Sequence, residues 1–184
     1  MRAVRRAGAA AGLALLAGCA PEYNWREIRA ADDGYVVMLP DKPAALTRRI
    51  DLDGLPVSMS MKGARVGETT FTVAVAALPD ATEATRAKAL AAMRAGMVRN
   101  IAGAERAATP VVVPVIDAAG ASAGSATGVR VEAAGRPQGR EMALSAGFVA
   151  RGARAWQWVV MGPAPDREQA GVFLQSFRLL QAAP

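Results

Sequence analysis

Histidine is absent from this 184-residue chain, and cysteine occurs once, at Cys19. Without histidine, the chain lacks the commonest general base, the Ser-His and Cys-His nucleophile pairs, and most zinc and copper sites. A single cysteine excludes an internal disulfide. Adjacent carboxylates such as Asp32 and Asp33 would point to opposite faces of an extended chain, so they form no ready acid–base pair. We therefore predict a protein that is not an enzyme, with no catalytic residues, no cofactor and no metal site.

The chain also lacks a long hydrophobic run and a basic stripe. The apolar run at residues 7–17 has 11 residues, whereas a membrane-spanning helix needs about 20. The formal net charge is +6, but the basic residues are scattered and accompany no nucleic-acid-binding motif. We therefore predict no transmembrane segment and no nucleic-acid partner.

The N-terminus has the form of a secretory leader. Arg2, Arg5 and Arg6 precede the apolar run, and small residues follow it, which is the pattern of a signal peptide. The run ends in Leu16-Ala17-Gly18-Cys19, which resembles a bacterial lipobox. The resemblance implies that the chain is cut before Cys19 and that this cysteine carries lipid.

This N-terminus divides the chain into three parts. We expect a lipoprotein signal peptide at 1–18, a lipidated cysteine and short tether at 19–24, and one domain at 25–184. The membrane would be a partner through the lipid, in the bacterial cell envelope facing the periplasm. Ala20 follows the cysteine, where an aspartate would suggest retention in the inner membrane, so we predict the inner leaflet of the outer membrane.

Turn signals and alternation predict a sheet built largely from hairpins. Asp33-Gly34 and Asp53-Gly54 each separate two extended runs, and an Asp-Gly pair favours a type I′ hairpin turn. Val57, Met59 and Met61 alternate with polar residues, as in a half-buried strand. Further strands are expected at 70–78, 111–117, 128–133, 140–151 and 154–161, with an exposed loop at 120–128.

Two segments instead have helical spacing. Asp80 and Glu83 indicate a helix start, and Leu90, Met93 and Met97 recur on one face before Gly103. A second helix is expected after an Asp166 cap. Strands in hairpins with two separate helices indicate an α+β fold, with an antiparallel sheet covered by helices.

Three stretches resemble the PsbP-like superfamily. The opening strand Gly34–Pro43 starts with an aromatic residue and ends in Pro-x-x-Pro, a helix lies at 82–101, and Phe173–Leu179 resembles the family's closing helix and tail. The resemblance implies a PsbP-like α/β/α sandwich, with six to eight antiparallel strands packed against two main helices. It also implies a binding or assembly role, and it transfers no functional residue to this chain.

Trp156 and Trp158 are the candidate binding residues, because residues two apart on a strand share a face. They would form either core packing under a helix or an exposed binding platform, with Trp156 the more exposed. We predict a non-catalytic binding or assembly accessory with an envelope protein partner. The alternatives are a carrier of a small apolar ligand between sheet and helix, favoured by an apolar cavity, and a carboxylate-dependent hydrolase, favoured by a polar cleft.

Overall fold

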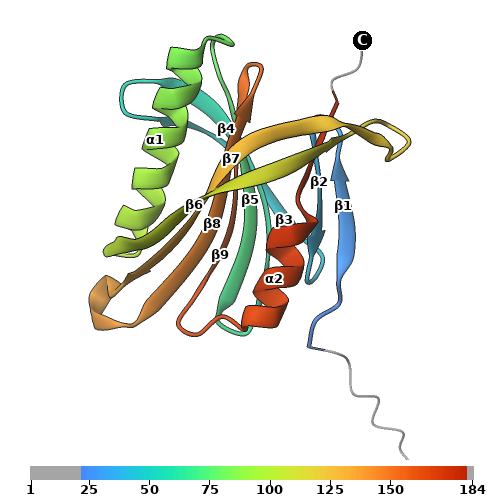
Figure 1. Ribbon diagram of the computed structural model, residues 1–184. Coiled ribbons are helices and arrows are strands. Elements are labelled where there is room, and N and C mark those ends of the chain that lie inside the picture. Colours follow the sequence, from blue (N-terminus) through green and yellow to red (C-terminus); the bar gives the residue numbers. More distant parts are fainter. Residues whose placement is uncertain (1–21, 182–184) are drawn as a thin grey trace, which may run out of the picture.

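The computed structural model describes residues 22–181, in which one large sheet carries a helix on each face (Figure 1). The strands are β1 (Arg26–Ala30), β2 (Tyr35–Leu39), β3 (Ala44–Asp51), β4 (Pro56–Val66), β5 (Thr69–Ala77), β6 (Gly103–Ile116), β7 (Ser122–Gly135), β8 (Met142–Arg151), β9 (Arg154–Gly162) and β10 (Arg178–Leu180). The helices are α1 (Glu83–Asn100) and α2 (Arg167–Ser176), with a 3₁₀ turn at Pro137–Gly139.

The sheet has ten strands in the order β1-β2-β10-β6-β7-β8-β9-β5-β4-β3. All neighbours are antiparallel except β10 and β6, which run parallel. The prediction of six to eight antiparallel strands packed on two helices, as a PsbP-like sandwich, is therefore wrong. The sheet is larger and mixed.

The strand residues beyond those predicted lie in segments without a hydrophobic pattern. β6 begins at Gly103, eight residues before the expected start, and residues 104–110 are all exposed. β7 begins at Ser122, inside the expected loop, and pairs with β6 over nearly its whole length. Backbone hydrogen bonds rather than burial hold residues 104–110, so side-chain periodicity could not reveal this part of β6. Toward the hairpin, which extends past the rest of the sheet in Figure 1, Val113 and Val115 are buried.

Local signals were more reliable. Asp53 and Gly54 both have positive φ, 57° and 79°, as a type I′ turn requires, and Leu52 and Leu55 exchange backbone hydrogen bonds across it. The first hairpin also forms, but through a four-residue loop in which Gly34 has φ 73°. Asp166 caps α2 as predicted, accepting from the Gln169 amide.

The first helix begins differently from the prediction. Thr82, not Asp80, is the N-cap of α1, and its hydroxyl accepts from the Thr85 amide at 3.2 Å. The Asp80 carboxylate instead accepts from the Thr82 amide and hydroxyl. Asp80 therefore supports the capping residue from two positions upstream.

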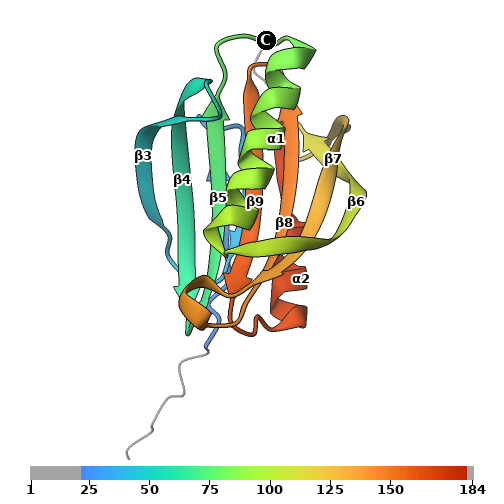
Figure 2. The ribbon, with the colours of Figure 1, turned by 90° about the vertical axis from the view of Figure 1, so that its left-hand side faces the viewer.

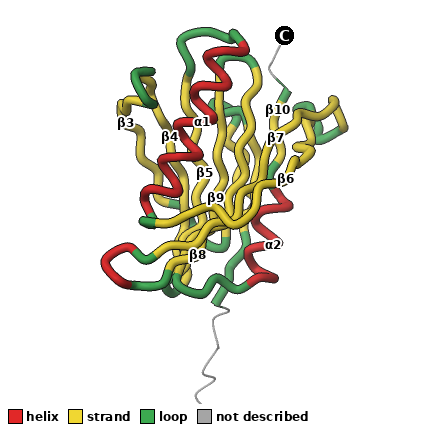
Figure 3. The backbone as a smooth tube through the Cα atoms, turned by 60° about the vertical axis from the view of Figure 1, so that its left-hand side comes forward, coloured by secondary structure: helices red, strands yellow, loops and turns green. Residues whose placement is uncertain are grey.

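Each face of the sheet has its own hydrophobic core. On one face α2 and the β1–β2–β10 end of the sheet enclose an aromatic core with Phe71, Trp156 and Trp158. On the other face α1 covers a core rich in alanine and methionine. Figure 2 looks onto the α1 face, and Figure 3 shows α1 and α2 on opposite sides of the strands.

Candidate functional site

The two candidate binding tryptophans lie in the aromatic core. Trp156 is 4% exposed and Trp158 1% exposed. The Trp158 indole stacks on Phe177 with ring centroids 4.3 Å apart and donates to the Leu174 carbonyl at 3.1 Å. The Trp156 indole donates to the Asp33 carbonyl at 2.8 Å. Both rings are therefore packed and hydrogen-bonded, as the core interpretation expects, and a binding role for the pair stays a prediction.

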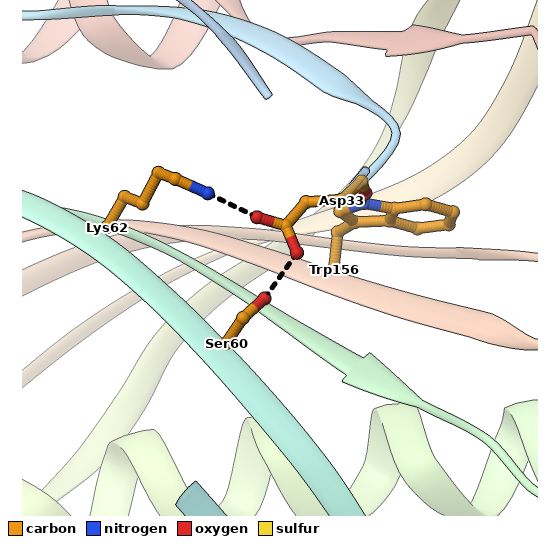
Figure 4. A network of polar contacts seen from close by, with 4 residues as sticks. All are labelled: Asp33, Ser60, Lys62 and Trp156. Atoms are coloured by element: carbon orange, nitrogen blue, oxygen red, sulfur yellow. Dashed lines mark hydrogen bonds and ion pairs between the residues drawn. The ribbon is translucent and has the colours of Figure 1, made fainter. Parts of the chain in front are cut away.

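A polar network joins the β1–β2 loop to the middle of β4 (Figure 4). The Asp33 carboxylate accepts from the Ser60 hydroxyl at 2.6 Å and pairs with the Lys62 ammonium. Burial acts to raise the pKa of Asp33, but the hydrogen bonds from Lys62 and Ser60 outweigh it and hold the pKa below its ordinary value.

This network is a structural latch. The Ser60 hydroxyl donates to a carboxylate that remains ionised, so its proton is not transferred to a base. Lys62 also lies over the ring of Tyr35, 5.9 Å from its centroid, and burial raises the pKa of that tyrosine hydroxyl. The latch links the β1–β2 end of the sheet to the face of β4, near the opposite end of the sheet.

The strongest candidate site lies on the opposite face, beside α1. α1 packs against β6, β7, β8 and β9, and in Figure 2 β3 and β4 extend past its edge. Thr70 and Thr72 on β5 line the floor, and Ala74 and Ala76 continue the same face of that strand into the buried core. The strands β3 and β4, which α1 leaves uncovered, and the side of the helix therefore form the two walls of a groove.

Methionine dominates the walls of this groove, whose volume is about 340 Å³. Five of the eight methionines line it. They are Met59 and Met61 on β4, Met93 and Met97 on α1, and Met161 on β9. Their flexible thioether side chains adapt to differently shaped apolar partners, so the groove suits an apolar ligand.

The two ends of the groove differ. One end is closed by the β3–β4 hairpin, where Gly54 lies near the Lys88 ammonium. At the other end Thr70 pairs with Met161 across β5 and β9, and the last turn of α1 contributes Arg99 and Asn100. Asp51 and Asp53 line the hairpin end, so charged or polar groups flank the methionines at both ends of the groove.

The Thr70 end of the groove lies at the same end of the molecule as the start of the described chain. Tyr23 packs edge-on against Phe71, the neighbour of Thr70, with centroids 6.4 Å apart. Tyr23 also borders the β4–β5 turn. Residues 22–24 of the predicted tether therefore already contact the fold, and Cys19 lies outside the described residues, as do the signal peptide and Ala20.

Other hollows in residues 22–181 support a site less well. A depression of about 800 Å³ lies beside Trp156 and the β8–β9 turn. It abuts Gln181, the last described residue. A second, of about 500 Å³, lies under α2 near Arg130 and Glu132. Its arginine already donates to the Leu174 carbonyl.

Two general properties bear on the site. Within the described part of the chain, no helix is long and apolar enough to cross a membrane. The same residues contain no group of three or more histidine, cysteine, aspartate or glutamate side chains placed to hold a metal ion. The groove lining combines methionine and other apolar side chains with polar ones such as Arg48, Thr72 and Gln157.

Sequence reasoning identified the two methionine stripes but not the groove. The alternation on β4 and the helical spacing on α1 both predict core-facing side chains. Met93 and Met59 are indeed buried, but Met61, Met97 and Met161 are only half-buried. Exposure of these side chains depends on how far α1 spreads across the sheet, which no local pattern reports.

No protein-family profile matches this chain, and no curated protein matches it. Among solved structures, it is similar to a Pseudomonas aeruginosa protein of unknown function. The two share 12% identity with a TM-score of 0.37, over 75% of this chain and 82% of the other.

Proposed function

We propose that this chain is a lipid-anchored envelope protein that binds, without catalysis, a small apolar or single-chain amphiphilic ligand in the groove beside α1. The observation that carries the proposal is the methionine-lined groove of about 340 Å³. That volume is at the low end of small-molecule sites, which span about 300–1,000 Å³. It suits one acyl chain or a ligand of similar size.

The distribution of exposed apolar residues supports a groove ligand over a flat docking face. The large exposed hydrophobic residues among those described are Leu46, Val112 and Val172. They lie on β3, β6 and α2, and Leu46 pairs with Met61 of the groove across β3 and β4. The predicted envelope protein partner has no comparable surface in its favour, and it stays a prediction.

The anchor would hold the Thr70 end of the sheet near the lipid. The lipobox resemblance assigns the lipid to Cys19, four residues before Tyr23. Four residues span at most about 14 Å, and Tyr23 packs against Phe71, the neighbour of Thr70, on the sheet face opposite the groove.

Fluorescent fatty-acid binding tests the groove. The Cys19→Ser full chain, which cannot be acylated, is titrated with a dansylated C11 fatty acid. A Cβ at Gly96 has open space in the groove, with only the Arg99 guanidinium at 3.9 Å, so Gly96→Phe should block the site and weaken binding at least tenfold. Gly171→Phe on α2 is the matched control and should bind as the parent does.

Two outcomes would reject this function: a probe that binds Gly96→Phe and parent equally, or a parent that does not bind the probe.

The location of the protein is tested separately. Mass spectrometry of the mature N-terminus should find a lipidated Cys19, and membrane fractionation should recover the chain with the outer membrane. An unmodified Cys19 would reject the anchor without touching the groove.

A further inference from the structure

Two methionine pairs face each other across the groove. Met59 and Met61 lie two apart on β4, and Met93 and Met97 lie four apart on α1. All four line the same cavity. Two strand residues rise about 6.6 Å and four helix residues about 6 Å, so the pairs have nearly the same spacing.

Register places the pairs at matching levels. Met61 pairs with Ala74 on β5, and Ala74 pairs with Gln157 on β9. The Gln157 amide donates to the Met97 sulfur at 3.3 Å. Met61 and Met97 therefore approach the same row of the sheet from two sides, with the Ala74 methyl group and the Gln157 side chain between them.

The direction of the chain places Met59 and Met93 at matching levels as well. β5 runs antiparallel to β4 and leads directly into α1, so α1 starts where β4 starts. The approach of Lys88 to Gly54 agrees with this direction. Met93 consequently lies one step from Met97 toward the hairpin, as Met59 does from Met61.

Four thioethers that line one cavity have a defined metal preference. Thioether sulfur is a neutral, soft donor that selects Cu(I) over hard divalent cations. It carries no proton to displace, unlike cysteine, histidine or a carboxylate. The prediction of no metal site was based on the missing histidine and cysteine and did not weigh methionine.

We propose that Met59, Met61, Met93 and Met97 form a binding site for a soft monovalent cation of the Cu(I) class. The ion enters already reduced, so binding needs no redox step and releases no proton. This site goes beyond the proposed apolar ligand, and the two occupants would compete for one space.

Silver(I), a soft monovalent ion stable in air, is the probe. Calorimetric titration of the Cys19→Ser full chain with silver nitrate should give one ion per chain, with an affinity unchanged between pH 5 and pH 7. In the same sample the methyl NMR signals of Met59, Met61, Met93 and Met97 should shift. Met38 and Met142, which do not line the groove, should keep their signals.

Substitution by leucine separates metal binding from apolar binding, because leucine keeps the volume and removes the sulfur. Met61→Leu with Met97→Leu should weaken silver binding at least tenfold, while the dansylated fatty acid still binds. Met38→Leu with Met142→Leu is the matched control and should leave silver affinity unchanged.

Silver affinity retained in the Met61→Leu/Met97→Leu chain would overturn the proposal, as would shifts at Met38 or Met142 in place of the groove methionines. If the double variant does not fold by circular dichroism, the single Met97→Leu variant and the parent methyl shifts decide the question. Loss of silver binding with intact fatty-acid binding supports the metal site. Failure of fatty-acid binding alone rejects only the proposed function.

Discussion

The two faces of the sheet are built from different side chains. Eight of the nine aromatic residues belong to the core under α2, and Phe148 alone lies on the α1 face. Six of the eight methionines lie on the α1 face. Aromatic rings bury large areas with few rotatable bonds, whereas methionine adapts its shape.

This difference assigns stability to the aromatic face of the sheet and ligand binding to the methionine face. The aromatic face is closed by α2, by the β1–β2–β10 end of the sheet and by the Asp33 latch, and its indoles are hydrogen-bonded to backbone carbonyls. The methionine face is only partly covered by α1 and retains a groove. A well-packed face can hold the fold while the other remains deformable enough to accept a ligand.

Removal of one large side chain from each face should give the largest contrast. Trp158→Ala should lower the free energy of unfolding by about 3–5 kcal/mol, the usual cost of a buried aromatic. Met97→Ala, on a half-buried side chain, should cost roughly 1–2 kcal/mol, below the range for fully buried methionine. Urea unfolding monitored by circular dichroism measures both, and equal losses would contradict the division between the faces.

The aromatic pair illustrates what the sequence could predict. Two tryptophans on alternate positions of one strand share a face because of strand geometry alone, and the structure places both in one core. The type I′ turn at Asp53-Gly54 and the Asp166 cap are likewise determined by residues close in sequence. These features form whatever the rest of the chain does.

The errors in the sheet and the groove involve distant partners, whereas the N-cap of α1 and the length of the first hairpin loop are local errors. β10, three residues long, joins the sheet only because β2 and β6 lie on either side of it, and nothing in Arg178–Leu180 signals a strand. The groove needs the stripe on β4 to face the stripe on α1. Each stripe was predictable, but their meeting depends on the direction of α1 and on the width of the sheet that it leaves uncovered.

An added methyl group should be tolerated poorly on the aromatic face. Gly147 pairs with Trp158, and a Cβ there would lie 2.1 Å from the indole ring. Gly147→Ala should therefore displace the ring and destabilise the protein by about 3 kcal/mol, at the upper end of overpacking effects. Thermal and urea unfolding measure the loss, and near-ultraviolet circular dichroism should report the displaced indole. Wild-type stability would show that the face is looser than its packing indicates.

The Asp33 latch should contribute less, and in a pH-dependent way. Asp33→Asn removes the charge opposite Lys62 and should cost about 1–2 kcal/mol at pH 7, within the range for a buried hydrogen-bonding group that loses its partner. Because the folded pKa lies below the unfolded value of about 3.9, the contribution is complete above that pH and is lost as the pH falls through the folded pKa. The difference between parent and variant should therefore shrink below about pH 4. A constant difference from pH 7 to pH 3 would exclude ionisation of Asp33 as its source.

The smallest effect should have the opposite sign. Gly96 lies within α1 at ordinary helical φ, and a Cβ there meets only the end of the Arg99 side chain at 3.9 Å. Gly96→Ala should therefore stabilise the protein by about 0.5–1 kcal/mol, because alanine favours the helix and fills no occupied space. Gly171→Ala in α2 is the matched control for helix propensity alone, since its Cβ also has room. If Gly96→Ala stabilises the protein as much as Gly171→Ala does, the groove has space beside Gly96. A glycine-to-alanine change would then stabilise the methionine face, whereas Gly147→Ala destabilises the aromatic face. A destabilising Gly96→Ala would mean that the groove is already filled by its own side chains, and it would count against both proposed occupants.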